Sequence, residues 1–261
     1  MIRLIAMDVD GTLVPDGCTN INPVLLDTIS KLHDQGICLA IASGREWSSV
    51  EWLFRPVLKK IFYLADNGAY VGMHGRSLFS HNVPQEYAVE TFRRIRQHPG
   101  LIPVGSDREG YVLDTHDDKL YDWLANGYHA NVRFTDDLTK VKDFLKVSAY
   151  DRTYNIEKTG EEIREAMQGK LQITNAGTMW LDLNAPGVSK GEAVRILQDS
   201  LSISPEETMA FGDQSNDISM FESAKYSFAV ANAVPEAKAA ARFEADANTR
   251  DGVLKILQLL L

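Results

Sequence analysis

Cysteine and long apolar runs are both scarce in this chain. Only two cysteines occur in 261 residues, Cys18 and Cys38, and because their spacing fits no ligand pattern we expect two reduced thiols. The longest apolar runs, such as the C-terminal LKILQLLL, are far below the roughly 20 residues that a membrane-spanning helix needs. The opening MIRLIAMD lacks the small-residue cleavage site of a signal peptide. We therefore expect a cytoplasmic protein with no membrane partner.

Basic clusters are also missing. The chain carries 27 Lys and Arg against 36 Asp and Glu, a net charge of −9, and no run of basic residues could follow a phosphate backbone. Nucleic acid is therefore excluded as an expected partner. A hydrophobic content of 44% can supply the core of one large domain or of two smaller ones.

Both ends of the chain alternate between strand and helix patterns. Residues 2–8 predict a buried strand, residues 22–36 a helix with Asn22 as N-cap and Pro23 as its first residue, and residues 37–42 a second buried strand. Continuous apolar strands joined by helices are typical of a parallel sheet covered on both faces. The alternation returns after residue 185, with helices predicted at 189–201, 215–224 and 251–261 and strands at 208–212 and 227–230.

The middle of the chain has a different pattern, with shorter apolar runs (YVLDT, FLKVSAY, MWLDL), the long helical stretch QEYAVETFRRIRQH, and many polar turns. We therefore predict an α/β protein in which a doubly wound, parallel-sheet core, residues 1–82 and 186–261, carries an inserted α+β domain at residues 83–185.

Two carboxylates lie at the end of the first predicted buried strand: Asp8 is its last residue, and Asp10 follows two residues later. Like charges at the mouth of an apolar strand repel each other, so they stay ionised only with a cation between them. Mg²⁺ suits such oxygen ligands, and Asp213, at the end of another predicted strand, could supply a third carboxylate. The alternative is an ordinary Asp-Gly turn, but Ser43 and Lys190, in polar segments of the same predicted core, argue against it.

Four ordered segments, DVDGT (8–12), SGR (43–45), SKG around Lys190, and GDQSND (212–217), resemble the motifs of the haloacid dehalogenase superfamily. The chain is most similar to its Cof-type (subfamily IIB) hydrolases, which carry a large α/β cap between the second and third motifs. Flanking segments agree as well, among them ADNGAY at 65–70 and NTRDGV at 248–253. The resemblance implies a Rossmann-like catalytic core and a cap that governs substrate specificity.

The resemblance also implies residue roles. Asp8 would be the nucleophile that forms an aspartyl-phosphate, and Asp10 the acid and base that protonates the leaving alcohol and then activates water. Mg²⁺ would be held by Asp8, the Asp10 carbonyl and Asp213, while Lys190 and Ser43 complete an electrostatic cradle.

Less direct duties fall to other motif residues. Thr12 would orient Asp10, and Asp217 would support the metal or the lysine from behind. Residues expected near the phosphate or the substrate are Gly44, Arg45, Asn67 and Asn216; for Arg45, interdomain or surface packing is the alternative.

The expected function is a Mg²⁺-dependent phosphatase of small phosphomonoesters, with sugar phosphates favoured and phosphorylated cofactors as other candidates. Asp10 argues against a dehalogenase or a cation pump, because those relatives lack this carboxylate. A phosphosugar mutase and a noncatalytic phosphometabolite sensor are the alternatives. The expected partner is a small phosphate ester, bound by a monomer or weak homodimer.

Overall fold

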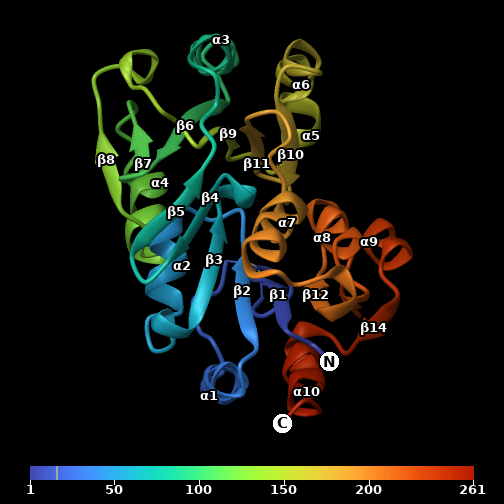
Figure 1. The fold of residues 1–261 in the computed structure, drawn as a ribbon. Coiled ribbons are helices and arrows are strands. Elements are labelled where there is room, and N and C mark those ends of the chain that lie inside the picture. Colours follow the sequence, from blue (N-terminus) through green and yellow to red (C-terminus); the bar gives the residue numbers. More distant parts are fainter. Residues whose placement is uncertain (16) are drawn as a thin grey trace. The chain divides into compact units, whose positions relative to one another are not determined.

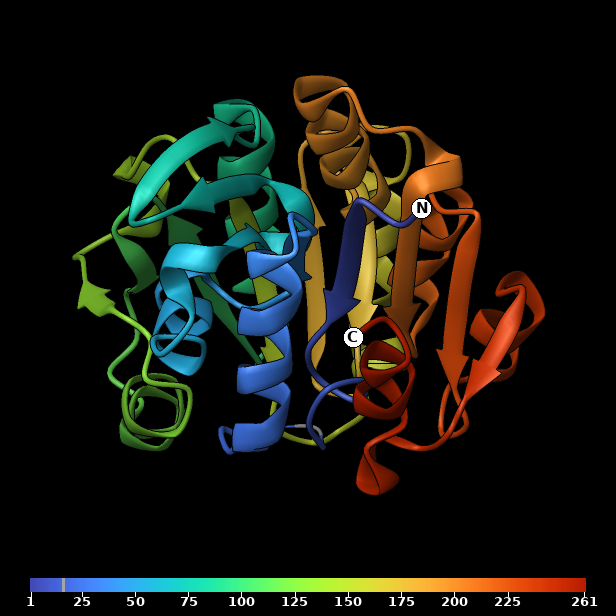
Figure 2. The same cartoon turned by 60° about the horizontal axis from the view of Figure 1, so that its bottom comes forward.

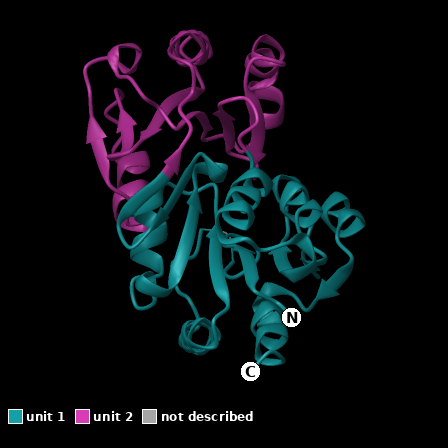
Figure 3. Cartoon of the chain, in the orientation of Figure 1, with its two compact units in different colours: residues 1–78, 189–261 teal, residues 79–188 magenta. Residues whose placement is uncertain are grey.

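The chain folds into two compact units in a computed structural model, which describes residues 1–15 and 17–261. Unit 1 comprises residues 1–78 and 189–261, and unit 2 comprises residues 79–188 (Figure 3). The mixed α/β class and the largely parallel core sheet are as predicted. The assignment of residues 1–82 and 186–261 to a catalytic core and of 83–185 to a cap stays a prediction.

Unit 1 is built on an eight-stranded sheet in the order β14-β13-β12-β1-β2-β3-β4-β5 (Figure 1). Six strands run parallel: β1 (Leu4–Asp8), β2 (Cys38–Ala42), β3 (Ile61–Ala65), β12 (Thr208–Gly212), β13 (Tyr226–Val230) and β14 (Phe243–Ala245). Next to β3 lies the antiparallel β4 (Tyr70–Met73), and β5 (Arg76–Ser80), whose last two residues belong to unit 2, forms the edge.

Helices cover both faces of this sheet. They are α1 (Pro23–Asp34), α2 (Trp47–Leu53), α7 (Lys190–Leu201), α8 (Ile218–Glu222), α9 (Pro235–Ala240) and α10 (Gly252–Gln258). The connections through α1 and through α8 proceed in opposite directions across the sheet, so right-handed crossovers put these two helices on opposite faces. The helix α10 packs on α1, and α7 packs on α8 (Figure 2).

The central strand β1 places the polar segments that follow the strands. All five of its residues are buried, because helices cover both faces, which explains the unbroken apolar run in the sequence. Asp8 pairs in register with Ala42 of β2, and Met7 with Phe211 of β12. The carboxyl ends of β12, β1 and β2 therefore meet at one edge of the sheet, where doubly wound folds bind ligands.

Several predicted helices are shorter than their patterns indicated. The helix predicted at 215–224 begins as a 3₁₀ turn, Ser215–Asp217, before α8, and the C-terminal helix ends at Gln258 rather than at residue 261. Further short helical turns are Leu58–Lys60, Asp66–Gly68, Pro205–Glu207 and Asn248–Arg250 in unit 1, and Trp123–Gly127 and Leu138–Lys140 in unit 2.

Unit 2 contains a six-stranded sheet in the order β10-β11-β9-β6-β7-β8. The strands are β6 (Leu101–Asp107), β7 (Gly110–Leu113), β8 (Val132–Phe134), β9 (Lys146–Asp151), β10 (Gln172–Ala176) and β11 (Trp180–Asn184), antiparallel except for the pair β7 and β8. One face packs on α3 (Gln85–Ile95), α5 (Ile156–Thr159) and α6 (Glu161–Met167), and the other on α4 (Asp118–Asp122) and the turn after it. Two cores in one unit follow from the period-two alternation of its strands.

Across residues 1–15 and 17–261, none of the helices combines the length and the apolar character required to span a bilayer.

Candidate active site

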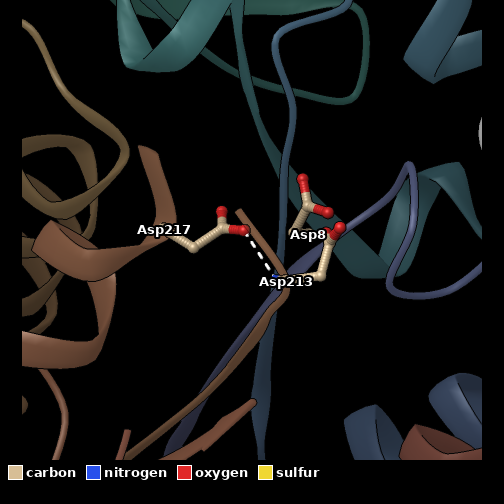
Figure 4. Close-up of side chains that lie close together, drawn as sticks. All are labelled: Asp8, Asp213 and Asp217. Carbon is tan, nitrogen blue, oxygen red and sulfur yellow. Dashed lines mark hydrogen bonds between the residues drawn. The ribbon is translucent and has the colours of Figure 1, made fainter. Parts of the chain in front are cut away.

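Three carboxylates meet at the carboxyl end of the unit 1 sheet. Asp8 ends β1, Asp213 directly follows β12, and Asp217 lies in the 3₁₀ turn before α8. One ligand atom from each lies within 4.8 Å of the others, and all three residues are buried (Figure 4). The loop that carries Asp213 and Asp217 is closed by Asp217, whose Oδ2 accepts hydrogen bonds from the backbone N–H of Asp213 at 2.9 Å and of Gln214 at 3.0 Å.

The electrostatics of this cluster favour a bound cation. Burial, and then the nearby Asp217 carboxylate, raises the pKa of Asp8 well above its ordinary value, although Lys190 opposes the rise. Burial and Asp217 also raise the pKa of Asp213 to about 6. Asp8 Oδ2 is buried and accepts no hydrogen bond from any of the described residues. An oxygen-rich, electron-rich group with an unpaired carboxylate oxygen fits a hard divalent ion such as Mg²⁺.

Lys190 balances part of this negative charge. Its Nζ donates to Asp8 Oδ1 at 2.6 Å and to Asp217 Oδ1 at 2.7 Å, and only 2% of the residue is exposed. Burial alone would lower the pKa of Lys190, but the Asp217 and Asp8 carboxylates outweigh it and raise the pKa above its usual range. The lysine is fixed as the first residue of α7, which is capped by the Ser189 hydroxyl.

Asp10 makes a different contact, with Arg45 from the segment after β2. Arg45 Nε donates to Asp10 Oδ2 at 2.7 Å, and Nη2 donates to Asp10 Oδ1 at 2.6 Å and to the Cys18 carbonyl at 2.9 Å. The carboxylate of Asp10 therefore lies outside the three-carboxylate cluster, while its main-chain carbonyl remains the metal ligand that we predict.

Thr12 bonds to a partner other than the predicted one. Its hydroxyl donates to Asp213 Oδ1 at 2.9 Å rather than to Asp10. The glycine before it, Gly11, has φ of +81°, and a Cβ at this position would collide with the Asp213 carboxylate. Both residues therefore shape the surroundings of Asp213.

The segments after β2 and β3 are joined by backbone hydrogen bonds. The N–H of Asn67 donates to the Ser43 carbonyl at 3.0 Å, and the Ser43 hydroxyl accepts from the N–H of Arg45 across Gly44. Asn67 adopts a left-handed conformation, φ +60°, and accepts a 3.3 Å hydrogen bond from the Asn216 amide. These five positions thus lie in the same unit as the acidic cluster.

Among the described residues of unit 1, two buried carboxyl groups escaped the sequence analysis. Glu46 and Asp66 are both 0% exposed. Burial, and then the Asp66 charge, raises the pKa of Glu46 to about 8. Glu46 caps α2 by accepting from the N–H of Ser48 at 3.0 Å. Only its position directly after SGR could have drawn attention to it, since glutamate is not a preferred N-cap.

Known proteins match this chain over nearly its whole length. A family model described as haloacid dehalogenase-like hydrolase matches residues 5–257. The 5-amino-6-(5-phospho-D-ribitylamino)uracil phosphatase of Escherichia coli is 28% identical over 262 residues, covering 100% of this chain and 96% of the relative. The HMP-PP phosphatase of Yersinia pseudotuberculosis is 26% identical over 242 residues, covering 91% and 87%.

Solved structures show the same fold. A crystal structure from Eubacterium rectale is 32% identical, with a TM-score of 0.88 over 100% of this chain and 99% of the other. A subclass IIB sugar phosphatase of the same superfamily has a TM-score of 0.83 at 22% identity, over 99% and 98% of the two chains. The predicted superfamily, fold class and enzyme class are confirmed, and the chain belongs to the haloacid dehalogenase-like hydrolases.

Proposed function

We propose that the protein is a Mg²⁺-dependent phosphatase that hydrolyses small phosphomonoesters through an aspartyl-phosphate on Asp8. The observation that carries the proposal is the buried group of Asp8, Asp213 and Asp217 around Lys190. Two relatives that match most or all of the chain are phosphatases of small phosphorylated compounds, which supports this class of substrate. Sugar phosphates are the favoured substrates, and phosphorylated cofactors are the other candidates.

In the first half-reaction, a carboxylate oxygen of Asp8 attacks phosphorus, and the bond from phosphorus to the ester oxygen breaks. Asp10 gives its proton to the departing alkoxide, so the alcohol leaves neutral. Lys190 Nζ donates a hydrogen bond to Oδ1 of the Asp8 carboxylate. Because Lys190 is itself bound to Asp217, this contact keeps the Asp8 side chain in one position.

In the second half-reaction, the Asp10 carboxylate takes a proton from water as the water oxygen attacks phosphorus. The bond from phosphorus to the Asp8 oxygen breaks, inorganic phosphate leaves, and the Asp8 carboxylate and the protonated Asp10 are restored. Asp8, Asp213 and the Asp10 carbonyl would hold Mg²⁺, which would neutralise the negative charge that opposes the approach of an anionic phosphate. Lys190 and Ser43 would complete the predicted electrostatic cradle around the phosphate, and Asn67 and Asn216 would lie near it.

The test is release of inorganic phosphate from a panel of phosphorylated sugars, nucleotides and cofactors, with and without Mg²⁺. Wild type, Asp8→Asn and the surface control Asp27→Asn are assayed in parallel. We expect Mg²⁺-dependent release that falls at least about 10³-fold in Asp8→Asn and is unchanged in the control. Release that survives in folded Asp8→Asn would contradict the mechanism.

The same panel separates the alternatives. A phosphosugar mutase would return an isomerised sugar phosphate instead of inorganic phosphate, and a sensor would bind without turnover. A monomer or weak homodimer remains the expected assembly, to be checked by sedimentation.

A further inference from the structure

The fork between Arg45 and Asp10 engages both oxygens of one carboxylate. Nε and Nη2 of the guanidinium approach Oδ2 and Oδ1 at 2.7 and 2.6 Å, the paired geometry in which arginine fixes a carboxylate in position and orientation. The Cys18 carbonyl accepts a third hydrogen bond from Nη2 at 2.9 Å. A carboxylate held at both oxygens cannot rotate about its terminal bond without breaking the fork.

Arg45 is itself anchored at the main chain. Its N–H donates to the Ser43 hydroxyl at 3.0 Å, and its carbonyl accepts from the N–H of Asp66 at 2.9 Å. The next residue, Glu46, caps α2. The guanidinium is therefore supported by the ends of β2, β3 and α2, which are rigid elements of unit 1, and rigid support is what a group that orients another side chain requires.

Exposure distinguishes the two members of the pair. The Arg45 side chain is 3% exposed, whereas the Asp10 side chain is 28% exposed. The carboxylate, and not the guanidinium, is thus the group that is open to a reacting molecule. This argues against the sequence-based expectation that Arg45 contacts the substrate.

We propose that Arg45 is a positioning residue that holds the Asp10 carboxyl group in the orientation required for proton transfer. The proposal rests on the proposed phosphatase function. Without the Arg45 guanidinium, the Asp10 side chain would sample other rotamers, and the geometry that allows proton transfer would be rare. A shift of about 1 Å at a reacting group can cost about 10²-fold in rate.

The effect should depend on the leaving group. An alkyl alcohol leaves poorly as an alkoxide and needs the proton from Asp10, whereas p-nitrophenolate leaves without one. Since kcat/KM reports the steps up to the first irreversible one, it isolates formation of the phosphoenzyme. In Arg45→Ala, kcat/KM should fall about 10- to 100-fold for a sugar phosphate and less than about 5-fold for p-nitrophenyl phosphate.

Two further observations separate positioning from a structural or substrate-binding role. Arg45→Lys keeps the charge but not the fork, so it should recover only part of the loss, and guanidinium ion should partly restore Arg45→Ala. Arg55→Ala is the matched control, because Arg55 lies over Trp52 near the end of α2, away from the acidic cluster. A rise in KM with an equal loss for both substrates would instead make Arg45 a substrate contact and overturn the proposal.

The crystal structure of Arg45→Ala, or of Arg45→Lys if the first variant does not fold, supplies a readout independent of turnover. We expect the Asp10 carboxyl group to be displaced or spread over several rotamers. A carboxyl group that keeps its wild-type position overturns the proposal whether or not the enzyme is active. Wild type that hydrolyses no substrate would contradict the proposed function instead, while the displacement of Asp10 would still be decided.

Discussion

Replacing Glu46 by glutamine should remove a large part of the pH dependence of stability. The carboxyl group of Glu46 is fully buried beside Asp66, and burial followed by the Asp66 charge raises its pKa from 4.5 to about 8. In the folded protein it therefore keeps its proton up to about pH 8, whereas in the unfolded chain it loses the proton near pH 4.5. Between these values the folded state binds more protons, so the free energy of unfolding falls as pH rises.

The magnitude follows from the width of that window. Each pH unit across which the two states differ by one proton changes the free energy of unfolding by about 1.4 kcal/mol. A window from 4.5 to about 8 thus corresponds to a loss of about 5 kcal/mol between acidic and alkaline pH. The loss is absent below pH 4.5 and complete above about pH 8.

Glutamine imitates the protonated carboxyl group. Its Oε1 can still accept from the N–H of Ser48, and its amide can donate to the Ser48 hydroxyl, so the cap of α2 is retained. Urea unfolding from pH 4.5 to 9, at constant Mg²⁺, should show Glu46→Gln equal to wild type at low pH and more stable by several kcal/mol at pH 9. The other carboxylates contribute equally to both proteins and cancel in the difference.

The control is Glu222→Gln, which removes one carboxylate from the exposed surface. It should change stability by less than about 0.5 kcal/mol throughout this range. Parallel curves for wild type and Glu46→Gln between pH 5 and 8 would refute the reasoning, because they would mean that Glu46 is ionised in the folded protein at neutral pH.

Two further predictions concern the acidic cluster. Lys190→Met leaves Asp8 and Asp217 without their shared cation and should lower the free energy of unfolding by about 3 to 5 kcal/mol in metal-free buffer at pH 7. In urea titrations, combining Lys190→Met with Asp217→Asn should recover part of this loss. A loss below about 1 kcal/mol in Lys190→Met alone would count against the ion pairs. Burial, together with Asp217, raises the pKa of Asp213 to about 6, so protons compete with Mg²⁺ for this carboxylate below that pH. Calorimetry should show a Mg²⁺ affinity that falls by up to about tenfold per pH unit below pH 6 for each proton displaced. An unchanged Mg²⁺ affinity between pH 6 and 5 would contradict the assignment of Asp213 as a metal ligand.

The sequence could predict which strands form and which residues follow them. Apolar runs ending in Asp8 and Gly212 mark buried parallel strands, and parallel neighbours bring their carboxyl ends to a common edge. That geometry explains why Asp8 and Asp213, which lie far apart in the chain, could be assigned to one site from the sequence alone. The prediction of an inserted domain rests on a contrast within the sequence, since the middle of the chain has shorter apolar runs and many polar turns.

The contacts and the burial of individual side chains could not be predicted in this way. Thr12 donates to Asp213 rather than to Asp10 because of rotamers and turn geometry that a motif does not encode. Burial of Glu46 depends on the packing of α2 against β3, which long-range contacts decide. The short edge strand β14 has only three residues, too few for a periodic pattern.

The position of β1 between β2 and β12 has a consequence for biosynthesis. As the chain leaves the ribosome, β1 and β2 are available early, but the other edge of β1 keeps its backbone groups unpaired until residues 208–212 emerge. Unit 2 is continuous in the chain and is fully translated before β12. The carboxylate cluster therefore cannot assemble until Asp213 and Asp217 emerge, so a nascent chain, or one truncated before residue 208, would expose an aggregation-prone strand edge and would lack two of the three carboxylates.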